Sequence, residues 1–300
     1  MKAYAPHAAY VAPAVRSSGL VHTVVGFCAI EFFYRLGTEA AFFLFDSLAE
    51  MTGSPALEPG SRPEVLFNLA TYGILAVAVV FVVWMTHHRG PRSLFGDVAR
   101  LWSDFRGATL AALTVFLLIE VISPVWYGTE AKPAPFWPWL LYLPWALVAI
   151  LVQVVSEDLL YRGYLQQQIA ARYQSPLAWL IIPNVIFATV HWSNGVDTID
   201  SVQYVIWAFV FGLAASDLVA RTGSLGAAIG LHFVNNIFAF VVIGSVDDLD
   251  SALALYLLPP VFDMPDAPPL ELDPAMVAYF GVDLGIILLV WLAIRIAVRR

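Results

Sequence analysis

Four polar residues in the second half of the chain have the side chains that hydrolysis of an amide bond requires. They are Glu157, His191, His232 and Asn236, and they fall on three different apolar segments. A carboxylate can take a proton from water, an imidazole can orient or share that proton, and N–H donors can stabilise a developing oxyanion. Ionisable residues at membrane depth are costly, so they are functional candidates by default. Together these residues predict a site that hydrolyses a peptide bond with activated water.

The carboxylate belongs to a motif that follows an apolar run directly, Ser156 to Tyr164. On a helix, Asp158 and Arg162 are four residues apart and can pair, whereas Glu157 points about a third of a turn away from them. Taken alone, the motif fits equally well a helix end that meets the lipid headgroups through an ordinary salt bridge.

The two histidine motifs also have ordinary explanations when each is taken alone. Phe187 and His191 share a helix face, and a lone histidine there is better explained as a core residue with its hydrogen bonds satisfied. His232 and Asn236 are four residues apart and face the same way, which also fits polar contacts between membrane helices. The catalytic interpretation depends on all three motifs occurring in one helical bundle.

The elements that carry these residues are long apolar runs. The 300 residues are 60% hydrophobic and 13% charged, and the mean hydropathy is +0.76. Runs of about 18–25 apolar residues span a bilayer, and in lipid such runs must be helices because their backbone amides need internal partners. We expect an all-α, polytopic transmembrane bundle of about eight helices with a polar intramembrane cavity. The expected spans lie near 20–45, 65–86, 107–125, 138–155, 177–191, 204–220, 225–244 and 276–294.

The first of these segments is less regular than the others, because Glu31, Arg35 and Glu39 interrupt it at spacings of four residues. These charges share one helix face and can pair with each other. Residues 20–45 therefore fit a tilted or interfacial helix as well as a membrane span.

The loops between these segments alternate in charge. Arginine marks one side, at positions 89, 92, 100, 106, 172, 221, 295, 299 and 300, while the alternate loops are acidic. Arginine bias marks the cytoplasmic side, so we expect a bacterial inner-membrane protein with both termini in the cytoplasm. The formal net charge of −8 argues against a nucleic-acid partner. We divide the chain into N-terminal membrane helices (1–135), a catalytic core (136–245), an acidic, Pro-rich extracytoplasmic loop (246–275) and a C-terminal membrane helix (276–300).

Three motifs in order resemble the CPBP family, the CAAX protease and bacteriocin-processing intramembrane endopeptidases, which are related to the type II CAAX prenyl endopeptidase. The motifs are Glu157-Asp158-x-x-x-Arg162, Phe187-x-x-x-His191 and His232-x-x-x-Asn236, and the similarity covers about 150–245. The resemblance implies a helical bundle with a conical cavity open to the cytoplasm or the membrane, and hydrolysis without a covalent intermediate.

The resemblance also implies roles for individual residues. Glu157 would activate water with help from His191, and His232 and Asn236 would form the oxyanion hole. Arg162 would orient or neutralise the carboxylates. The family usually has glutamate where this chain has Asp158, whose shorter side chain still reaches a partner four residues away.

Two other functions use the same residues. Glu157, His191 and His232 with a water would satisfy a catalytic zinc site, so a zinc peptidase stays open beside the metal-free mechanism, which the resemblance favours. A non-catalytic membrane scaffold would use the polar cluster only to hold helices together. We expect no cofactor unless zinc is bound. The expected partners are the lipid bilayer and a membrane-associated protein or peptide substrate, with the oligomeric state left open.

Overall fold

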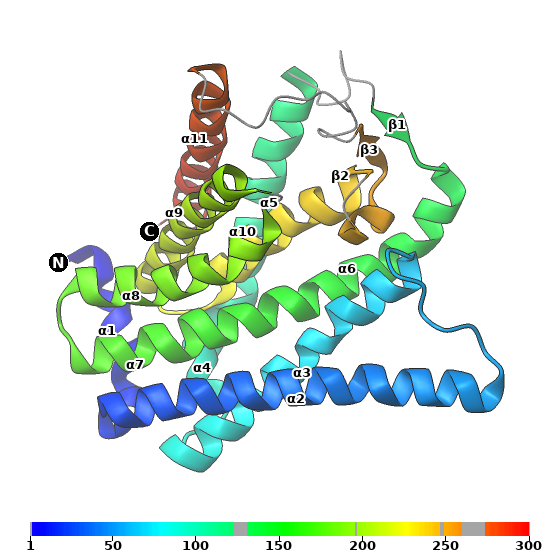
Figure 1. Ribbon diagram of the computed structural model, residues 1–300. Coiled ribbons are helices and arrows are strands. Elements are labelled where there is room, and N and C mark those ends of the chain that lie inside the picture. The colour runs from blue at the N-terminus through cyan, green and yellow to red at the C-terminus, as the bar shows by residue number, and fades with distance from the viewer. Residues whose placement is uncertain (1, 123–130, 196, 247–248, 260–273, 300) are drawn as a thin grey trace.

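The computed structural model describes residues 2–122, 131–195, 197–246, 249–259 and 274–299. Long helices form a bundle, and three short strands lie near one end of it (Figure 1). The two labelled chain ends lie on the left in Figure 1, away from the strands. The expected all-α, polytopic architecture is confirmed.

Seven helical segments in the described part of the chain are long and apolar enough to cross a membrane, which makes this an integral, multi-pass membrane protein. They are α2 (Leu20–Thr52), α3 (Arg62–His87), α5 (Val98–Ile122), Phe136–Arg172, Pro176–Asn194, α9 (Thr198–Thr222) and Met276–Ala297 within α11 (Pro274–Ala297). The seventh expected span, near 225–244, corresponds to a shorter apolar segment, Gly226–Val242, which joins α10 (Gly226–Ile237) to the π-helix η5 (Phe238–Val242). The irregular first segment, expected near 20–45, is one continuous helix.

The shorter elements lie at the two ends of the bundle. Before α2 come η1 (Lys2–Tyr4), α1 (Ala5–Val11) and η2 (Ala12–Ser17), and α4 (Arg92–Phe95) precedes α5. At the other end, strand β3 (Tyr256–Leu258) pairs antiparallel with β1 (Lys132–Pro133) and parallel with β2 (Ile243–Ser245). Most of the expected loop 246–275 lies outside the described residues, and its described part carries η6 (Leu249–Leu253) and β3.

Local sequence signals set several helix boundaries. The Ser61 hydroxyl accepts a hydrogen bond from the amide of Glu64 at the start of α3, and the Asp197 carboxylate accepts one from the amide of Asp200 at the start of α9. Such caps satisfy amides that have no partner within the helix. Helix α9 ends at Gly223, which has φ +73°, a conformation that glycine adopts without a steric penalty.

The helix that carries the Glu157 motif is longer than the apolar run 138–155 indicated. It runs from α6 (Phe136–Asp158) through the π-helix η3 (Leu159–Gln166) into α7 (Gln167–Arg172). The interpretation of the motif as a helix end at the headgroups is therefore wrong, because the helix continues and its polar residues find partners inside the protein. π-Helical turns are rare in proteins, and those that occur are often at functional sites.

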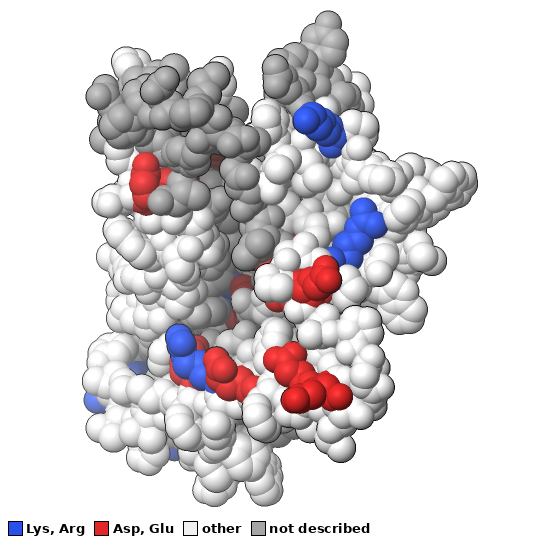
Figure 2. All heavy atoms as spheres, turned by 45° about the vertical axis from the view of Figure 1, so that its right-hand side comes forward, with Lys and Arg blue, Asp and Glu red and all other residues white. Residues whose placement is uncertain are grey.

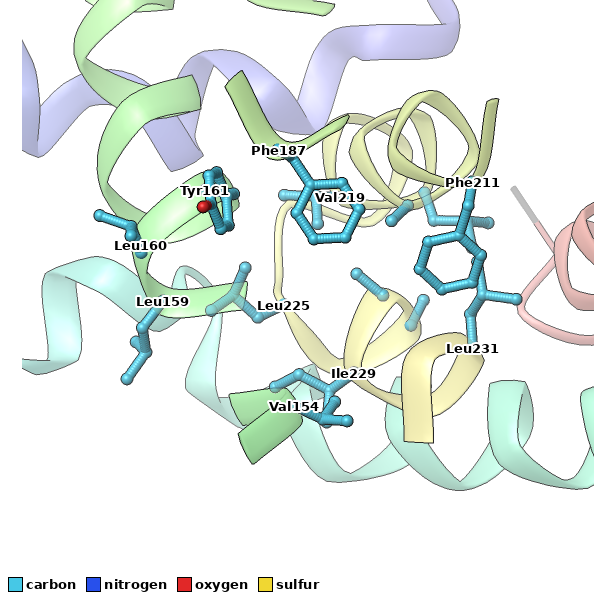
Figure 3. Packing of buried hydrophobic residues seen from close by; sticks show 14 of the residues in the cluster. Val154, Leu159, Leu160, Tyr161, Phe187, Phe211, Val219, Leu225, Ile229 and Leu231 are labelled. Atoms are coloured by element: carbon cyan, nitrogen blue, oxygen red, sulfur yellow. The ribbon is translucent and has the colours of Figure 1, made fainter. Parts of the chain in front are cut away.

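The hydrophobic core surrounds this motif. Figure 3 shows side chains from η3, α8 (Pro176–Thr189), α9 and α10 converging, among them Leu160, Phe187 and Phe211. Helix α10 packs closely against α5 because glycines face it: a Cβ at Gly230 would lie 2.8 Å from the carbonyl oxygen of Phe105. This close packing places α10, which carries the third motif, in the interior of the bundle.

Candidate active site

The four expected catalytic residues line one cavity of about 640 Å³. Glu157 comes from the end of α6, His191 from the 3-10 turn η4 (Val190–Asn194) that follows α8, and His232 and Asn236 from α10. Residues from three separate helical segments therefore meet in one space, as the motifs predict. A cavity with convergent polar groups is the usual form of a binding or catalytic site.

A line of side-chain amides ends at the Glu157 carboxylate. The Asn235 amide donates to Asn236 Oδ1 over 3.1 Å, and the Asn236 amide donates to Gln153 Oε1 over 3.0 Å. The Gln153 amide in turn donates to Glu157 Oε1 over 3.2 Å. In each of these bonds an amide nitrogen donates to an oxygen of the next side chain, so the last side chain, Glu157, must accept a hydrogen bond. Asn236 on α10 thus fixes Gln153 on α6, and Gln153 holds one oxygen of the Glu157 carboxylate in place.

His232 lies between two carboxylates. Its Nε2 is 3.7 Å from Glu157 Oε2, and its Nδ1 is 3.6 Å from Asp158 Oδ2. His232 itself is 4% exposed. Its imidazole can therefore exchange or share a proton at the Glu157 end while Asp158 faces the other nitrogen, an arrangement that fixes the orientation of a histidine ring.

Asp158 and Arg162 form a fully buried ion pair beneath the cavity. The Arg162 Nη1 lies 3.0 Å from Asp158 Oδ1, and both side chains are 0% exposed. The guanidinium carbon also lies 4.4 Å from the centroid of the Phe187 ring. The expected pairing at four residues' spacing is present. Arg162 therefore contacts the site in two ways, through its ion pair with Asp158, which faces His232, and through the ring of Phe187.

His191 is held by its own helix. Its Nδ1 lies 2.8 Å from the carbonyl oxygen of Phe187, one turn earlier. A carbonyl can only accept, so Nδ1 carries the hydrogen and Nε2 of the neutral ring keeps a lone pair. His191 is therefore in the tautomer that can accept a proton at Nε2.

Aromatic side chains line the apolar side of the site. The rings of Phe187 and His191 are 4.6 Å apart, the rings of Phe211 and His232 are 5.2 Å apart, and Trp207 stacks on Phe211 at 5.1 Å. Apolar surroundings strengthen electrostatic interactions with reacting groups by keeping bulk water away from them.

The polar groups are not gathered as metal ligands. Among the described residues, no group of three or more His, Cys, Asp or Glu side chains is placed to hold a metal ion. The alternative set of Glu157, His191 and His232 lines one cavity but does not form a three-ligand site in this structure.

A hydrogen bond from the N-terminal helix α1 stabilises the π-helix η3. Tyr10 in α1 donates to the carbonyl oxygen of Arg162 over 2.9 Å, which satisfies a buried backbone acceptor in η3. Burial raises the pKa of Tyr10, so the phenol keeps its hydrogen. Burial likewise lowers the pKa of the nearby His7 to about 4, and its ring lies 4.1 Å from that of Trp179.

Several residues that line the cavity were not expected from the motifs, among them Gln153, Asn235 and Asp283. Gln153 precedes Glu157 by four residues, and that spacing on one helix face was an available signal. Asn235 is adjacent to the third motif and begins the amide series. Asp283 comes from α11, which matches no motif, and its only sequence signal was a carboxylate inside an apolar run.

Comparisons with known proteins cover the same part of the chain. Residues 138–238 match the family model described as type II CAAX prenyl endopeptidase Rce1-like. The uncharacterized protein YyaK of Bacillus subtilis (strain 168) is 29% identical over 139 residues, which are 46% of this chain and 46% of that protein. The match thus spans less than half the length of that curated relative. No solved structure matches the chain significantly. The resemblance recognised from the motifs is confirmed for residues 138–238, which hold all four candidate catalytic residues.

Proposed function

Because residues 138–238 are Rce1-like and the family consists of CAAX-type intramembrane proteases and their relatives, we propose that this chain is an intramembrane endopeptidase. It hydrolyses a peptide bond of a membrane-associated protein or peptide with water that Glu157 and His191 activate. The observation that carries the proposal is the meeting of Glu157, His191, His232 and Asn236 around one cavity of about 640 Å³.

The reaction follows from these groups. The Glu157 carboxylate takes a proton from water while the water oxygen attacks the carbonyl carbon of the scissile bond, with His191 Nε2 orienting or sharing that proton. The carbonyl oxygen becomes an oxyanion, which N–H groups of His232 and Asn236 stabilise. The proton then passes to the amide nitrogen, the C–N bond breaks, and an amine and a carboxylic acid leave. One water is consumed, and no covalent bond to the protein forms.

The remaining polar residues position these groups. Gln153 holds one oxygen of Glu157, which leaves the other oxygen on the side of His232. The buried pair of Asp158 and Arg162 keeps a carboxylate next to His232 Nδ1. Fixed side chains need no reorganisation as charge develops in the transition state.

The test replaces Glu157 with Gln, which keeps the size and removes the base. We expect no cleavage by the variant, while its thermal unfolding and helical circular dichroism in detergent match those of the wild type. The matched control is Glu50→Gln, an exposed glutamate near the end of α2 that does not line the cavity. Comparing the membrane proteomes of cells that carry wild type and Glu157→Gln identifies the substrate, a protein left uncut only with the variant. Normal processing with the variant would refute the mechanism and favour a scaffold.

Chelation separates the metal-free mechanism from a zinc peptidase. We expect purified protein to keep its activity after exhaustive treatment with a chelator, because Glu157 and His191 supply the base without a metal. Activity that is lost on chelation and restored by stoichiometric zinc would contradict this mechanism.

The orientation in the membrane is part of the proposal. Exposed arginines, among them Arg92, Arg172 and Arg299, lie at the end of the bundle that holds the chain termini. We place this end in the cytoplasm of a bacterial cell, because basic residues accumulate on the cytoplasmic side.

A further inference from the structure

The N-terminal segment, residues 2–17 in η1, α1 and η2, packs against the helix that carries Glu157 but lies outside the family match at 138–238. It lies on the left in Figure 1. Figure 2 turns the right-hand side of that view forward and shows a hollow there with acidic atoms inside it. No described residue of the segment is among those that line the candidate cavity. Any effect of the segment on the site must therefore pass through the helices between them.

Tyr10 makes the contact that reaches furthest towards the site. Its side chain is 2% exposed, and its ring packs so closely on Gly96 that a Cβ there would lie 2.5 Å from Tyr10 Cδ2. Its hydroxyl oxygen is 2.9 Å from the carbonyl oxygen of Arg162 and 3.3 Å from that of Leu94. A phenol has one hydrogen to donate, and the shorter distance directs it to Arg162. The backbone of Arg162 is thus held from outside its own helix.

This hydrogen bond enters the π-helix η3. In a π-helix the carbonyl of Arg162 would accept from the amide five residues later, that of Gln167. The Gln167 amide instead donates to the carbonyl oxygen of Tyr164. Tyr10 supplies a donor to the Arg162 carbonyl from α1. A side chain that inserts into the backbone hydrogen bonds of a helix changes the local winding of that helix. Tyr10 therefore helps to set the winding of η3.

The winding of η3 determines which way Glu157 and Asp158 face. Side chains at the far end of η3 and the start of α7 are anchored to other elements, with Tyr164 donating to Thr23 O over 3.0 Å, Gln166 to Ser216 O over 3.1 Å and Gln167 to Ser93 O over 2.9 Å. A π-turn and an α-turn contain different numbers of residues, so a change between them rotates the residues before η3 relative to those after it. Because the far end is anchored, the rotation would turn Glu157 and Asp158.

Side-chain contacts continue from Arg162 to the base. Arg162 Nη1 lies 3.0 Å from Asp158 Oδ1, and Asp158 Oδ2 lies 3.6 Å from His232 Nδ1. His232 Nε2 in turn lies 3.7 Å from Glu157 Oε2. From these contacts we propose that Tyr10 is a positioning residue of the site, whose hydrogen bond to Arg162 keeps Asp158 and Glu157 facing His232. The proposal rests on the proposed peptidase function and assigns to it a residue outside the family match.

The first experiment observes His232 directly, so that it does not depend on catalysis. Purified full chain in detergent, with ¹³C at Cε1 of its histidines, is examined by ¹H–¹³C nuclear magnetic resonance, and His232→Gln assigns the resonance. We expect Tyr10→Phe, which keeps the ring and removes the hydroxyl, to move the His232 resonance by more than its line width. An unmoved resonance in that variant would overturn the proposal.

Tyr4→Phe is the matched control within the same segment. The Tyr4 hydroxyl donates to Asp217 Oδ1 in α9 over 2.6 Å, and Asp217 keeps hydrogen bonds from Arg221 and Trp291 when that hydroxyl is removed. Both variants thus lose one hydroxyl that attaches the N-terminal segment to the bundle, but only Tyr10→Phe loses a bond to η3. We expect Tyr4→Phe to leave the His232 resonance in place. Equal shifts in the two variants would show that the segment only stabilises the fold, which would also overturn the proposal.

The second experiment measures kinetics with the substrate that the Glu157→Gln comparison identifies. We expect Tyr10→Phe to lower kcat about tenfold or more, because a small misplacement of the reacting groups slows the chemical step. We expect KM to stay within about twofold of wild type, because the residues that line the cavity are unchanged. Tyr4→Phe should keep kcat. Wild-type kcat in Tyr10→Phe would overturn the proposal even if the protein is an active protease. A moved His232 resonance in a protein that cleaves nothing would support the positioning contact and count against the peptidase function.

Discussion

Replacing Arg162 with methionine tests whether the buried ion pair supports the site. Arg162 and Asp158 are both 0% exposed, and their closest atoms are 3.0 Å apart. The substitution keeps most of the side-chain volume but leaves the Asp158 carboxylate buried without its cation. Removing one partner of such a pair costs about 3–5 kcal/mol, because the remaining charge has lost both water and its counter-ion. We expect the variant to be destabilised by about that amount.

The assay is the unfolding free energy of purified protein in mixed micelles, obtained by titration with sodium dodecyl sulfate and followed by circular dichroism. Arg100→Met is the matched control, because Arg100 pairs with Asp97 at 3.2 Å but both side chains are nearly half exposed. Such a pair contributes less than about 1 kcal/mol. The double variant Asp158→Leu/Arg162→Met removes both charges and should recover much of the stability. A single variant within about 1 kcal/mol of wild type, or a double variant no more stable than the single one, would refute the reasoning.

Two further predictions concern the positioning residues and the N-terminal segment. Gln153→Leu keeps a side chain of similar volume but removes the hydrogen bond to Glu157. We expect kcat to fall about tenfold, equivalent to about 1.4 kcal/mol, with KM little changed. An unchanged kcat would show that the hydrogen-bonded amides of Asn235, Asn236 and Gln153 do not position the base. His7 is buried and its pKa is lowered to about 4, so the unfolded chain binds its proton at a higher pH than the folded protein does. Stability should therefore be fully present above pH 6.5 and decline as the pH falls towards 4. Thermal unfolding at pH 5 and pH 7 measures this, and His7→Gln should show a smaller difference between the two; an equal difference in the variant would assign the effect to other groups.

Much of the candidate site could be predicted from spacing along single helices. Asp158 and Arg162 are four residues apart on one helix, and they pair. His232 and Asn236 have the same spacing and line the same cavity. Residues four apart share a face of any α-helix. A long apolar run in lipid must form a helix, because its backbone amides find hydrogen-bond partners only within the segment. For the same reason the positions of the membrane segments followed from hydropathy, with the largest error at the end of the fourth segment, where a polar motif continues the helix.

Tertiary packing decided which residues of different helices contact one another. The hydrogen bond from Asn236 to Gln153 joins residues 83 positions apart, and Asp283 reaches the cavity from a helix without any motif. Spacing identifies which residues share a face, but it does not determine how far a neighbouring helix is rotated or shifted. Side-chain packing determines that, as where glycines let α10 approach α5 closely. The sequence alone therefore determined a helical membrane protein with three protease-like motifs. Only the packed bundle decided that the three motifs share one cavity.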